Sequence, residues 1–163
     1  GYAVSIALQK GTEIVLGVVY DPLTKESYVA ERGKGATLNG KRLKTSGCSV
    51  VEKALVAVSF SPHVRRDSPE IRRFVEILLA SQSVRRMGSA ALDLAYVAAG
   101  RLDGFWEDGL HAWDVAAGII MIREAGGFVS EISGGQKLLD GGSIVAGNEL
   151  IHKALLKTLA KPA

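Results

Sequence analysis

The feature of the sequence that most constrains the fold is an uncharged stretch in its C-terminal third. Between Asp114 and Arg123 the chain reads VAAGIIMI, without a charged or strongly polar side chain. A helix that is apolar on every side belongs in the interior of a protein. The stretch is also much shorter than the ~20 residues that a membrane-spanning helix needs. We therefore predict a buried helix from about Asp114 to Ala125 that begins with a carboxylate.

Patterns on both sides of this helix predict a layered α/β fold. The first sixty residues alternate between apolar and polar positions around turn signals such as Asn39-Gly40, which is typical of antiparallel strands. After a buried strand over 54–60, strands alternate with helices. We expect Ser68, Ser89 and Asn148 to cap three of these helices. A chain of this length fits one domain in which helices cover sheets.

Composition and charge exclude several classes of protein. Twenty basic residues against seventeen acidic ones give a net charge of +3, with no long run of like charges as in a nucleic-acid-binding arm. The single cysteine, Cys48, rules out an internal disulfide and favours a reducing compartment. The chain does not open with a secretory signal. We therefore expect a cytoplasmic protein that binds neither membranes nor nucleic acid.

Four features that resemble functional motifs have simpler structural interpretations. The segment GKGA, Gly33–Ala36, lacks the full spacing of a dinucleotide or phosphate loop and is typical of a turn. Asp21-Pro22 indicates a connection between two strands. His63 and His152 each lack a second ligand at a metal-binding spacing.

One candidate site lies where the segment RRMGSAALD turns from a strand into a helix at Gly88 and Ser89. The N-terminus of a helix has free N–H groups and a partial positive charge, which favour a bound phosphate or carboxylate. Ser89 is equally well explained as an ordinary helix cap. The pattern alone leaves both interpretations open.

A second candidate is the acidic cluster ahead of the uncharged helix. Glu107, Asp108, His111 and Asp114 fall within one strand-to-helix connection, at the edge where layered α/β proteins bind ligands. Mg²⁺ takes oxygen ligands from one or two carboxylates and from a substrate phosphate. Because aspartate is also a common helix cap, the pattern suggests a metal-and-phosphate site without deciding for it.

The segment WDVAAGIIMIREAGG, Trp113–Gly127, resembles the C-terminal signature of the inositol monophosphatase family, W-D-x-A-A-G followed by E-A-G-G. Two further segments, GVVYDPLTKESYVAERGKGATLNGKRL and RRMGSAALDLAYVAAGRLDGFWE, are similar to that family in the same order. The resemblance covers essentially the whole chain. It implies a layered αβαβα fold, with residues 1–163 forming a single domain that is the C-terminal portion of the fold and incomplete at the N-terminus. Glu124 and the glycines after it are expected to end the helix.

The resemblance also implies a chemistry. Members of the family are Mg²⁺-dependent phosphomonoesterases, usually homodimers, and are often inhibited by lithium. By resemblance, Asp114 is a metal ligand and Glu107 contacts substrate hydroxyl groups. The other site residues are expected to line the pocket, either as a turn against the substrate (Gly88, Ser89, Ala90) or as its wall (His111, Trp113).

The chain departs from the family pattern at the metal site. The family's other metal ligands are an early glutamate and a D-P-x-D-G-T-x-N loop ahead of the strand that corresponds to residues 1–9. Asp21-Pro22 does not replace that loop, because Leu23-Thr24 follows it. With Asp114 alone, we expect the 163-residue chain to bind Mg²⁺ poorly and not to turn over substrate. Its start within a strand pattern favours a longer protein in which the metal loop is present.

The sequence thus predicts a Mg²⁺-dependent phosphomonoesterase whose metal-activated water hydrolyses a small polyol phosphate, with myo-inositol monophosphate as the first choice. Related members act on fructose bisphosphate, histidinol phosphate, adenosine bisphosphate or NADP, and these substrates stay open. The alternative from another class is a non-catalytic binding or assembly module, associated with nucleic acid, that has lost the upstream metal loop.

Overall fold

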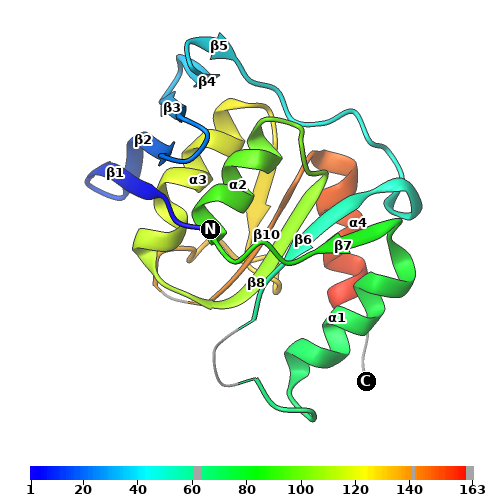
Figure 1. The fold of residues 1–163 in the computed structure, drawn as a ribbon. Helices are drawn as coiled ribbons and strands as arrows, with labels where there is room; N and C mark the ends of the chain where they lie inside the picture. Colours follow the sequence, from blue (N-terminus) through cyan, green and yellow to red (C-terminus); the bar gives the residue numbers. More distant parts are fainter. Residues whose placement is uncertain (61–63, 141, 161–163) are drawn as a thin grey trace.

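The computed structural model of the chain describes residues 1–60, 64–140 and 142–160. Two β-sheets and four α-helices make up this described part and are stacked in alternating layers (Figure 1). Within the same residues, no helix is long and apolar enough to cross a membrane.

Sheet A is an antiparallel meander built from the N-terminal part of the chain. Its strands pair in the order of the sequence: β1 (Val4–Lys10), β2 (Glu13–Asp21), β3 (Glu26–Glu31), β4 (Gly35–Leu38) and β5 (Lys41–Arg42). Between β4 and β5, Asn39 and Gly40 have positive φ angles of 47° and 81°. These angles are the ones that a two-residue hairpin turn requires, and they confirm the turn predicted from Asn-Gly.

Sheet B is mixed, with the strand order β7-β6-β8-β10-β9. β6 runs parallel to β7 and β8, whereas β10 is antiparallel to β8 and β9. The strands are β6 (Leu55–Val58), β7 (Ser83–Arg85), β8 (Gly104–Leu110), β9 (Phe128–Ser130) and β10 (Gly142–Gly147). Because parallel neighbours need a crossover connection, a helix follows each of β6 and β7.

The helices are α1 (Pro69–Ala80), α2 (Ala90–Ala98), α3 (Ala112–Glu124) and α4 (Glu149–Leu159), and a short 3₁₀ helix covers Val51–Lys53. Ser68, Ser89 and Asn148 precede three of them, as predicted. Of these three caps, only Asn148 accepts backbone hydrogen bonds through its side chain.

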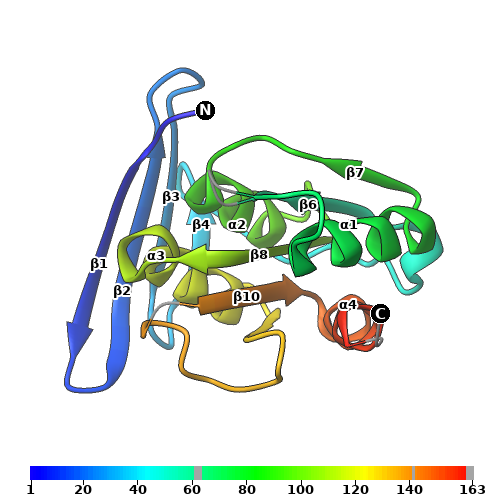
Figure 2. The same cartoon turned by 90° about the horizontal axis from the view of Figure 1, so that it is seen from below.

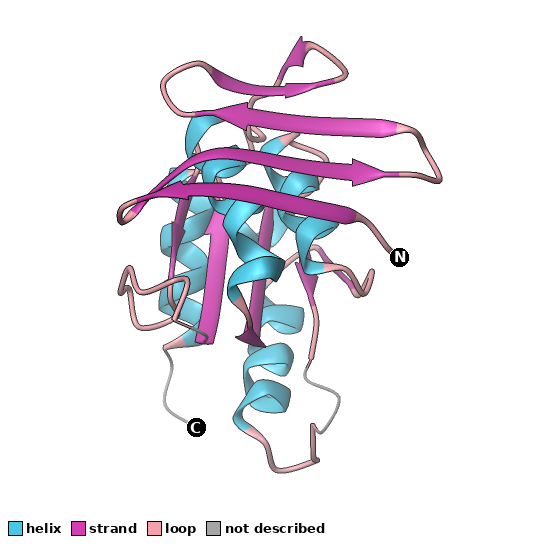
Figure 3. Cartoon of the chain, turned by 90° about the vertical axis from the view of Figure 1, so that its left-hand side faces the viewer, coloured by secondary structure: helices cyan, strands magenta, loops and turns pink. Residues whose placement is uncertain are grey.

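Helices α2 and α3 fill the space between the sheets, and α1 and α4 cover the other face of sheet B. α3 contacts mainly β1, β2 and β3 of sheet A, and α2 contacts β8 and β10 of sheet B as well as β2. Figure 2 shows this succession from sheet A at the left to α4 at the right, and in Figure 3 the strands of sheet A cross in front of sheet B. The uncharged segment lies inside α3, buried at every position from 115 to 122 except Ala116. The structure therefore confirms the layered α/β fold and the buried helix.

The boundaries around α3 differ from the prediction. Its N-cap is His111, so Asp114 is the third residue of the helix rather than the first. β8 continues to Leu110, which places Glu107 within the strand rather than at its end. Asp108-Gly109 is typical of a turn in the sequence, but in the structure Gly109, with a φ angle of 77°, lies within β8 where its pairing with β10 is irregular. The strand therefore continues past the residues that the sequence pattern treats as its end.

Helix α3 makes close contacts on two sides at positions without a side chain. A Cβ atom on Gly17 of β2 would lie 2.9 Å from the Cα atom of Ala117. A Cβ atom on Gly118 of α3 would lie 2.5 Å from the Cβ atom of Leu94 in α2. Both distances are shorter than a van der Waals contact, so the last glycine of the W-D-x-A-A-G segment is a packing residue.

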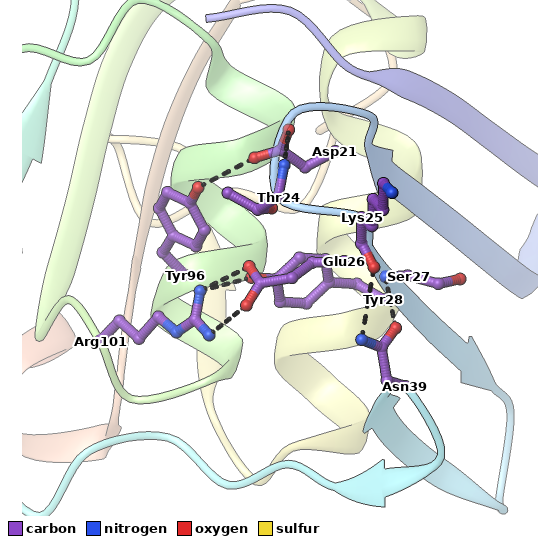
Figure 4. Close-up of polar contacts among 9 residues, drawn as sticks. All are labelled: Asp21, Thr24, Lys25, Glu26, Ser27, Tyr28, Asn39, Tyr96 and Arg101. Carbon is purple, nitrogen blue, oxygen red and sulfur yellow. Dashed lines mark hydrogen bonds and ion pairs between the residues drawn. The ribbon is translucent and has the colours of Figure 1, made fainter.

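A polar network joins the C-terminal end of α2 to sheet A (Figure 4). The Arg101 guanidinium donates to both carboxylate oxygens of Glu26, at 2.6 and 2.7 Å, and to the Tyr28 hydroxyl at 2.9 Å. The Tyr96 hydroxyl donates to Asp21 Oδ2 at 3.5 Å, and Asp21 Oδ1 accepts N–H groups of its own turn. The hydrogen bond from Arg101 lowers the pKa of Glu26 to about 2. The Asp21-Pro22 turn is therefore structural, as predicted.

Glu124 ties the end of α3 to the turn between β3 and β4. Its two carboxylate oxygens accept the backbone N–H groups of Gly33, at 2.8 Å, and of Gly35, at 2.7 Å. Both glycines have left-handed φ angles, 74° and 86°, which other residues rarely adopt. The GKGA segment is thus the turn that the sequence predicts, and it is held by Glu124, a residue distant from it in the sequence.

Gly118→Ala is expected to lower the free energy of unfolding by about 1–2 kcal/mol, because the added methyl group overlaps the Leu94 side chain. Urea denaturation followed by circular dichroism measures the change. Gly47→Ala is the matched control: an added Cβ there meets no atom within 4 Å, so the effect should stay within about 0.5 kcal/mol. Equal losses in the two variants would contradict a tight contact between α2 and α3.

Glu26→Gln is expected to lower the free energy of unfolding by about 1–2 kcal/mol at pH 7, because the ion pair with Arg101 loses its negative charge. The folded-state pKa of Glu26 lies below the unfolded value of about 4.3. The contribution is therefore present above that value and is lost as the pH falls toward 2. Urea titrations at pH 7 and pH 3 should show the two proteins converging in acid. Glu31→Gln, which disrupts only an exposed pair with Lys34, should have little effect at either pH.

Candidate active site

A pocket of about 480 Å³ lies beside the start of α3, where β1, β6, β8 and α2 meet it. β6 and β8 are parallel neighbours, and layered α/β proteins bind ligands beyond the carboxyl ends of such strands. The lining residues are Ala3, Ser5, Ser59, Gly88, Ser89, Ala90, Ala91, Glu107, Leu110, Trp113 and Asp114. Six of the seven site residues that the family resemblance implies are in this set. The seventh, His111, is not.

The turn before α2 forms one side of the pocket. Gly88 has a left-handed φ angle of 81°, which lets the chain change direction between β7 and the helix. Ser89 is the N-cap, and its hydroxyl makes no capping hydrogen bond. The amides of Ala90 and Ala91 belong to the first turn of α2, so they have no acceptor within the helix. This side of the pocket therefore presents hydrogen-bond donors and the positive end of a helix dipole.

Glu107 forms the opposite side. The register of β6 against β8 pairs Val58 with Trp106, which brings Ser59 level with Glu107, and the Ser59 hydroxyl hydrogen-bonds this carboxylate. Glu107 is 7% exposed, and its Oε2 atom has no hydrogen-bond partner among the described residues. Burial, together with the nearby charges of Asp93 and Asp114, raises the pKa of Glu107 to about 7.

Asp114 is held in place by its own helix. Its Oδ2 atom accepts the backbone N–H of His111 at 3.0 Å, as in a capping box. The helix-cap interpretation and the functional one are therefore compatible, because a carboxylate with a fixed orientation still has its other oxygen for a ligand in the pocket.

Trp113 and His111 stack at the rim, with ring centroids 4.5 Å apart. Trp113 lines the pocket although its side chain is 69% exposed, and the Ser5 hydroxyl donates to its backbone carbonyl at 3.2 Å. His111 therefore contributes to the site by stacking on the Trp113 indole and not by lining the pocket itself.

A comparison with known protein families matches residues 1–162 to the inositol monophosphatase family. The chain belongs to this family. The inositol-1-monophosphatase of Mesorhizobium japonicum is 52% identical over 99% of the chain and 61% of that protein. The Nus factor SuhB of Escherichia coli K12 is 44% identical over 97% of the chain and 60% of that protein.

Solved structures of inositol monophosphatase relatives have the same fold. The extragenic suppressor protein suhB of Bartonella henselae superposes with a TM-score of 0.94 at 45% identity, covering 99% of this chain and 62% of that one. The inositol monophosphatase of Anabaena gives a TM-score of 0.91 at 40% identity, covering 98% and 64%. The chain thus spans about three fifths of the length of the relatives that it matches.

The pocket contains side chains of the type that bind a hard divalent cation. The free oxygen of Asp114 and the unpartnered oxygen of Glu107 are carboxylate ligands of the type that Mg²⁺ prefers. The described residues contain no group of three or more acidic, histidine or cysteine side chains arranged to hold a metal. Asp114 can therefore supply one ligand of such an ion.

Other features of the structure lie away from this pocket. His152 is buried in α4 and hydrogen-bonds Ser130 at 2.9 Å, while His63 falls outside the described residues. Asp108 follows Glu107 in β8 but forms a 2.7 Å ion pair with Arg73 of α1, on the other face of sheet B. A larger cavity of about 840 Å³ between α1 and α4 is lined by Asp108 but by none of the site residues that the family resemblance implies.

The sequence analysis missed several residues of this site. Ser59 and Ser5 face the pocket from segments with no motif, and only the pairing of distant strands brings them there. The sequence analysis makes no prediction for Asp93, which is fully buried and has no hydrogen-bond partner for either carboxylate oxygen in the described chain. One signal was available: an acidic residue in an otherwise apolar helix, ALDLAYVAA, that has no polar face for it.

Asp93→Asn is expected to stabilise the protein relative to wild type as the pH rises. Burial raises the pKa of Asp93 to about 7, above the unfolded value of about 3.9. Its contribution to stability is therefore complete below pH 4 and is lost as the pH rises to 7, by about 2–4 kcal/mol. The amide does not titrate. Urea titrations at pH 5 and pH 8 should therefore show that the free energy of unfolding of the variant, relative to that of wild type, is higher at pH 8 than at pH 5. Asp67→Asn, at an exposed position, should show no such trend.

Proposed function

We propose that the protein is a Mg²⁺-dependent phosphomonoesterase that hydrolyses a small polyol phosphate, with myo-inositol monophosphate as the preferred substrate class. The observation that supports this most is the single pocket that combines a helix N-terminus with two carboxylates, Glu107 and Asp114. Membership of the inositol monophosphatase family supports a phosphatase. Because the chain spans only part of its relatives, the activity is proposed for the complete gene product.

The chain's own residues have separate tasks in this reaction. Asp114 would hold Mg²⁺ through the oxygen that its helix leaves free. Bound Mg²⁺ supplies charge stabilisation and a more acidic water. The amides at the start of α2 stabilise negative charge on phosphate oxygens. Glu107 accepts hydrogen bonds from a substrate hydroxyl and thereby orients the ring.

The pocket also bears on substrate choice. Glu107 and the hydroxyl groups of Ser5, Ser59 and Ser89 suit a ligand with several hydroxyl groups. Inositol monophosphate and 2'AMP have both been bound to an inositol monophosphatase of Staphylococcus aureus that is 29% identical to this chain. A panel of phosphate esters, compared by kcat/KM, would rank polyol against nucleotide and bisphosphate substrates.

We further propose that the protein is a cytoplasmic homodimer, as is usual for the family. A second candidate function follows from the relatives named Nus factor SuhB, which are up to 44% identical to the chain. It is an assembly role without catalysis, in which nucleic acid is a partner. A mobility shift with RNA that weakens steeply with salt would favour it.

Asp114→Asn in the complete gene product is expected to lower kcat/KM for myo-inositol 1-phosphate by at least 100-fold, because it removes a negative ligand of Mg²⁺. Phosphate release measured across a Mg²⁺ titration tests this, and the half-saturating Mg²⁺ concentration should rise. Asp140→Asn, an exposed carboxylate outside the pocket, is the control and should behave as wild type. Unchanged activity and Mg²⁺ dependence in Asp114→Asn would overturn the assignment.

A further inference from the structure

Asp93 is the described residue whose placement is hardest to explain by folding alone. Its side chain has no solvent exposure, and both carboxylate oxygens are buried without a hydrogen-bond donor from the described residues. Burying a carboxylate without partners is unfavourable, and apolar side chains of similar size would suit the position better. A buried acid of this kind, next to a pocket, is more consistent with a functional role than with a structural one.

The helix directs Asp93 toward the pocket. Asp93 is in the first turn of α2, and its amide donates to the Ser89 carbonyl at 2.9 Å. Residues three and four positions apart share a helix face, so Asp93 lies below Ala90 and Ser89, which both line the pocket. Side chains also lean toward the N-terminus of their helix. The carboxylate therefore points to the pocket end of α2, one layer behind the lining.

The same region contains a second unpartnered oxygen. Glu107 comes from β8, which contacts α2, and its Oε2 atom is buried without a partner in the described chain. The charge of Asp93 is close enough to contribute to the raised pKa of Glu107. Three buried acceptor oxygens thus lie on two packed elements, and the described residues supply a donor to none of them.

We propose that Asp93 is a positioning residue for Glu107, and that a buried water molecule joins the two carboxylates. A water has two protons to donate, one to each acid, and buried waters are found where polar groups otherwise lack partners. Through this bridge Asp93 fixes the orientation of the Glu107 carboxylate, so that its outer edge meets a hydroxyl group of the ligand. The inference rests on the proposed function, because it assigns Glu107 to a polyol.

The test compares two substrates in a double-mutant cycle. The complete gene product carries Asp93→Asn, Glu107→Gln or both, and kcat and KM are measured for myo-inositol 1-phosphate and for p-nitrophenyl phosphate, which has no ring hydroxyl groups. Asp93→Asn should raise KM for the inositol ester by about tenfold, with a loss on the aryl ester at least fivefold smaller. In the Glu107→Gln background, Asp93→Asn should have less than a twofold further effect.

Asp103→Asn is the matched control. Asp103 is another carboxylate near β8, but it accepts the Leu55 amide at 2.6 Å and does not line the pocket. Its replacement should affect the two substrates equally, if at all. Equal losses on both esters in Asp93→Asn, or multiplicative effects in the double mutant, would overturn the positioning role.

A high-resolution crystal structure of the complete gene product separates failure of this inference from failure of the proposed function. If wild type hydrolyses neither ester, the proposed function fails, and the inference is still decided by electron density. A water within hydrogen-bond distance of both carboxylates supports it. A protein donor on Asp93 in place of that water, or a direct contact between the two acids, overturns it.

Discussion

The close approach of α3 to its two neighbours is the contact on which the rest of the structure depends. Gly17 lets β2 reach the backbone of α3, and Gly118 lets Leu94 of α2 rest against it. With no side chain between them, these elements have little freedom to shift. A buried helix without charge can form such contacts on more than one side, because none of its faces has to meet water.

This packing has a direct effect on the pocket. The first turn of α3 carries Asp114 and Trp113, and the first turn of α2 carries Ser89 and Ala90. Because the two helices pack tightly, their N-termini stay at a fixed separation where both line the pocket. Preorganised groups of this kind are what a charged ligand requires, since the protein then does not have to reorganise when it binds.

The sequence predicted most of the fold because its elements have strong local signals. Alternation, the Asn39-Gly40 turn and the residues before each helix indicated the strands and helices in the right order. The predicted site residues came from two short segments, 88–90 and 107–114, and within each segment they are close together because they are close in sequence. Ser5 and Ser59 could not be found in this way, since they depend on strand pairing across most of the chain.

Asp93 shows a different limit of sequence analysis. The helical pattern shows that Asp93 faces the interior of the protein. It does not show whether a hydrogen-bond donor lies next to the carboxylate, because that depends on how β8 and the pocket are arranged around α2. The raised pKa of Glu107 likewise results from its burial and from the charges of Asp93 and Asp114, and not from the residues next to it in the sequence. The cost of burying these carboxylates can be recognised only in the three-dimensional structure, where the neighbours of each side chain are known.

The two hydrogen bonds of Glu124 connect segments about ninety residues apart in the chain. A change in the length of the β3–β4 turn would therefore alter a surface loop and also deprive the Glu124 carboxylate at the end of α3 of its two N–H donors. Insertions, tags or circular permutation breaks should be far better tolerated at the β1–β2 turn around Gly11, where a side chain would meet no other atom. A residue of the family signature thus constrains the length of a surface turn that is distant in the sequence. We expect the length of this turn and the presence of Glu124 to vary together in evolution.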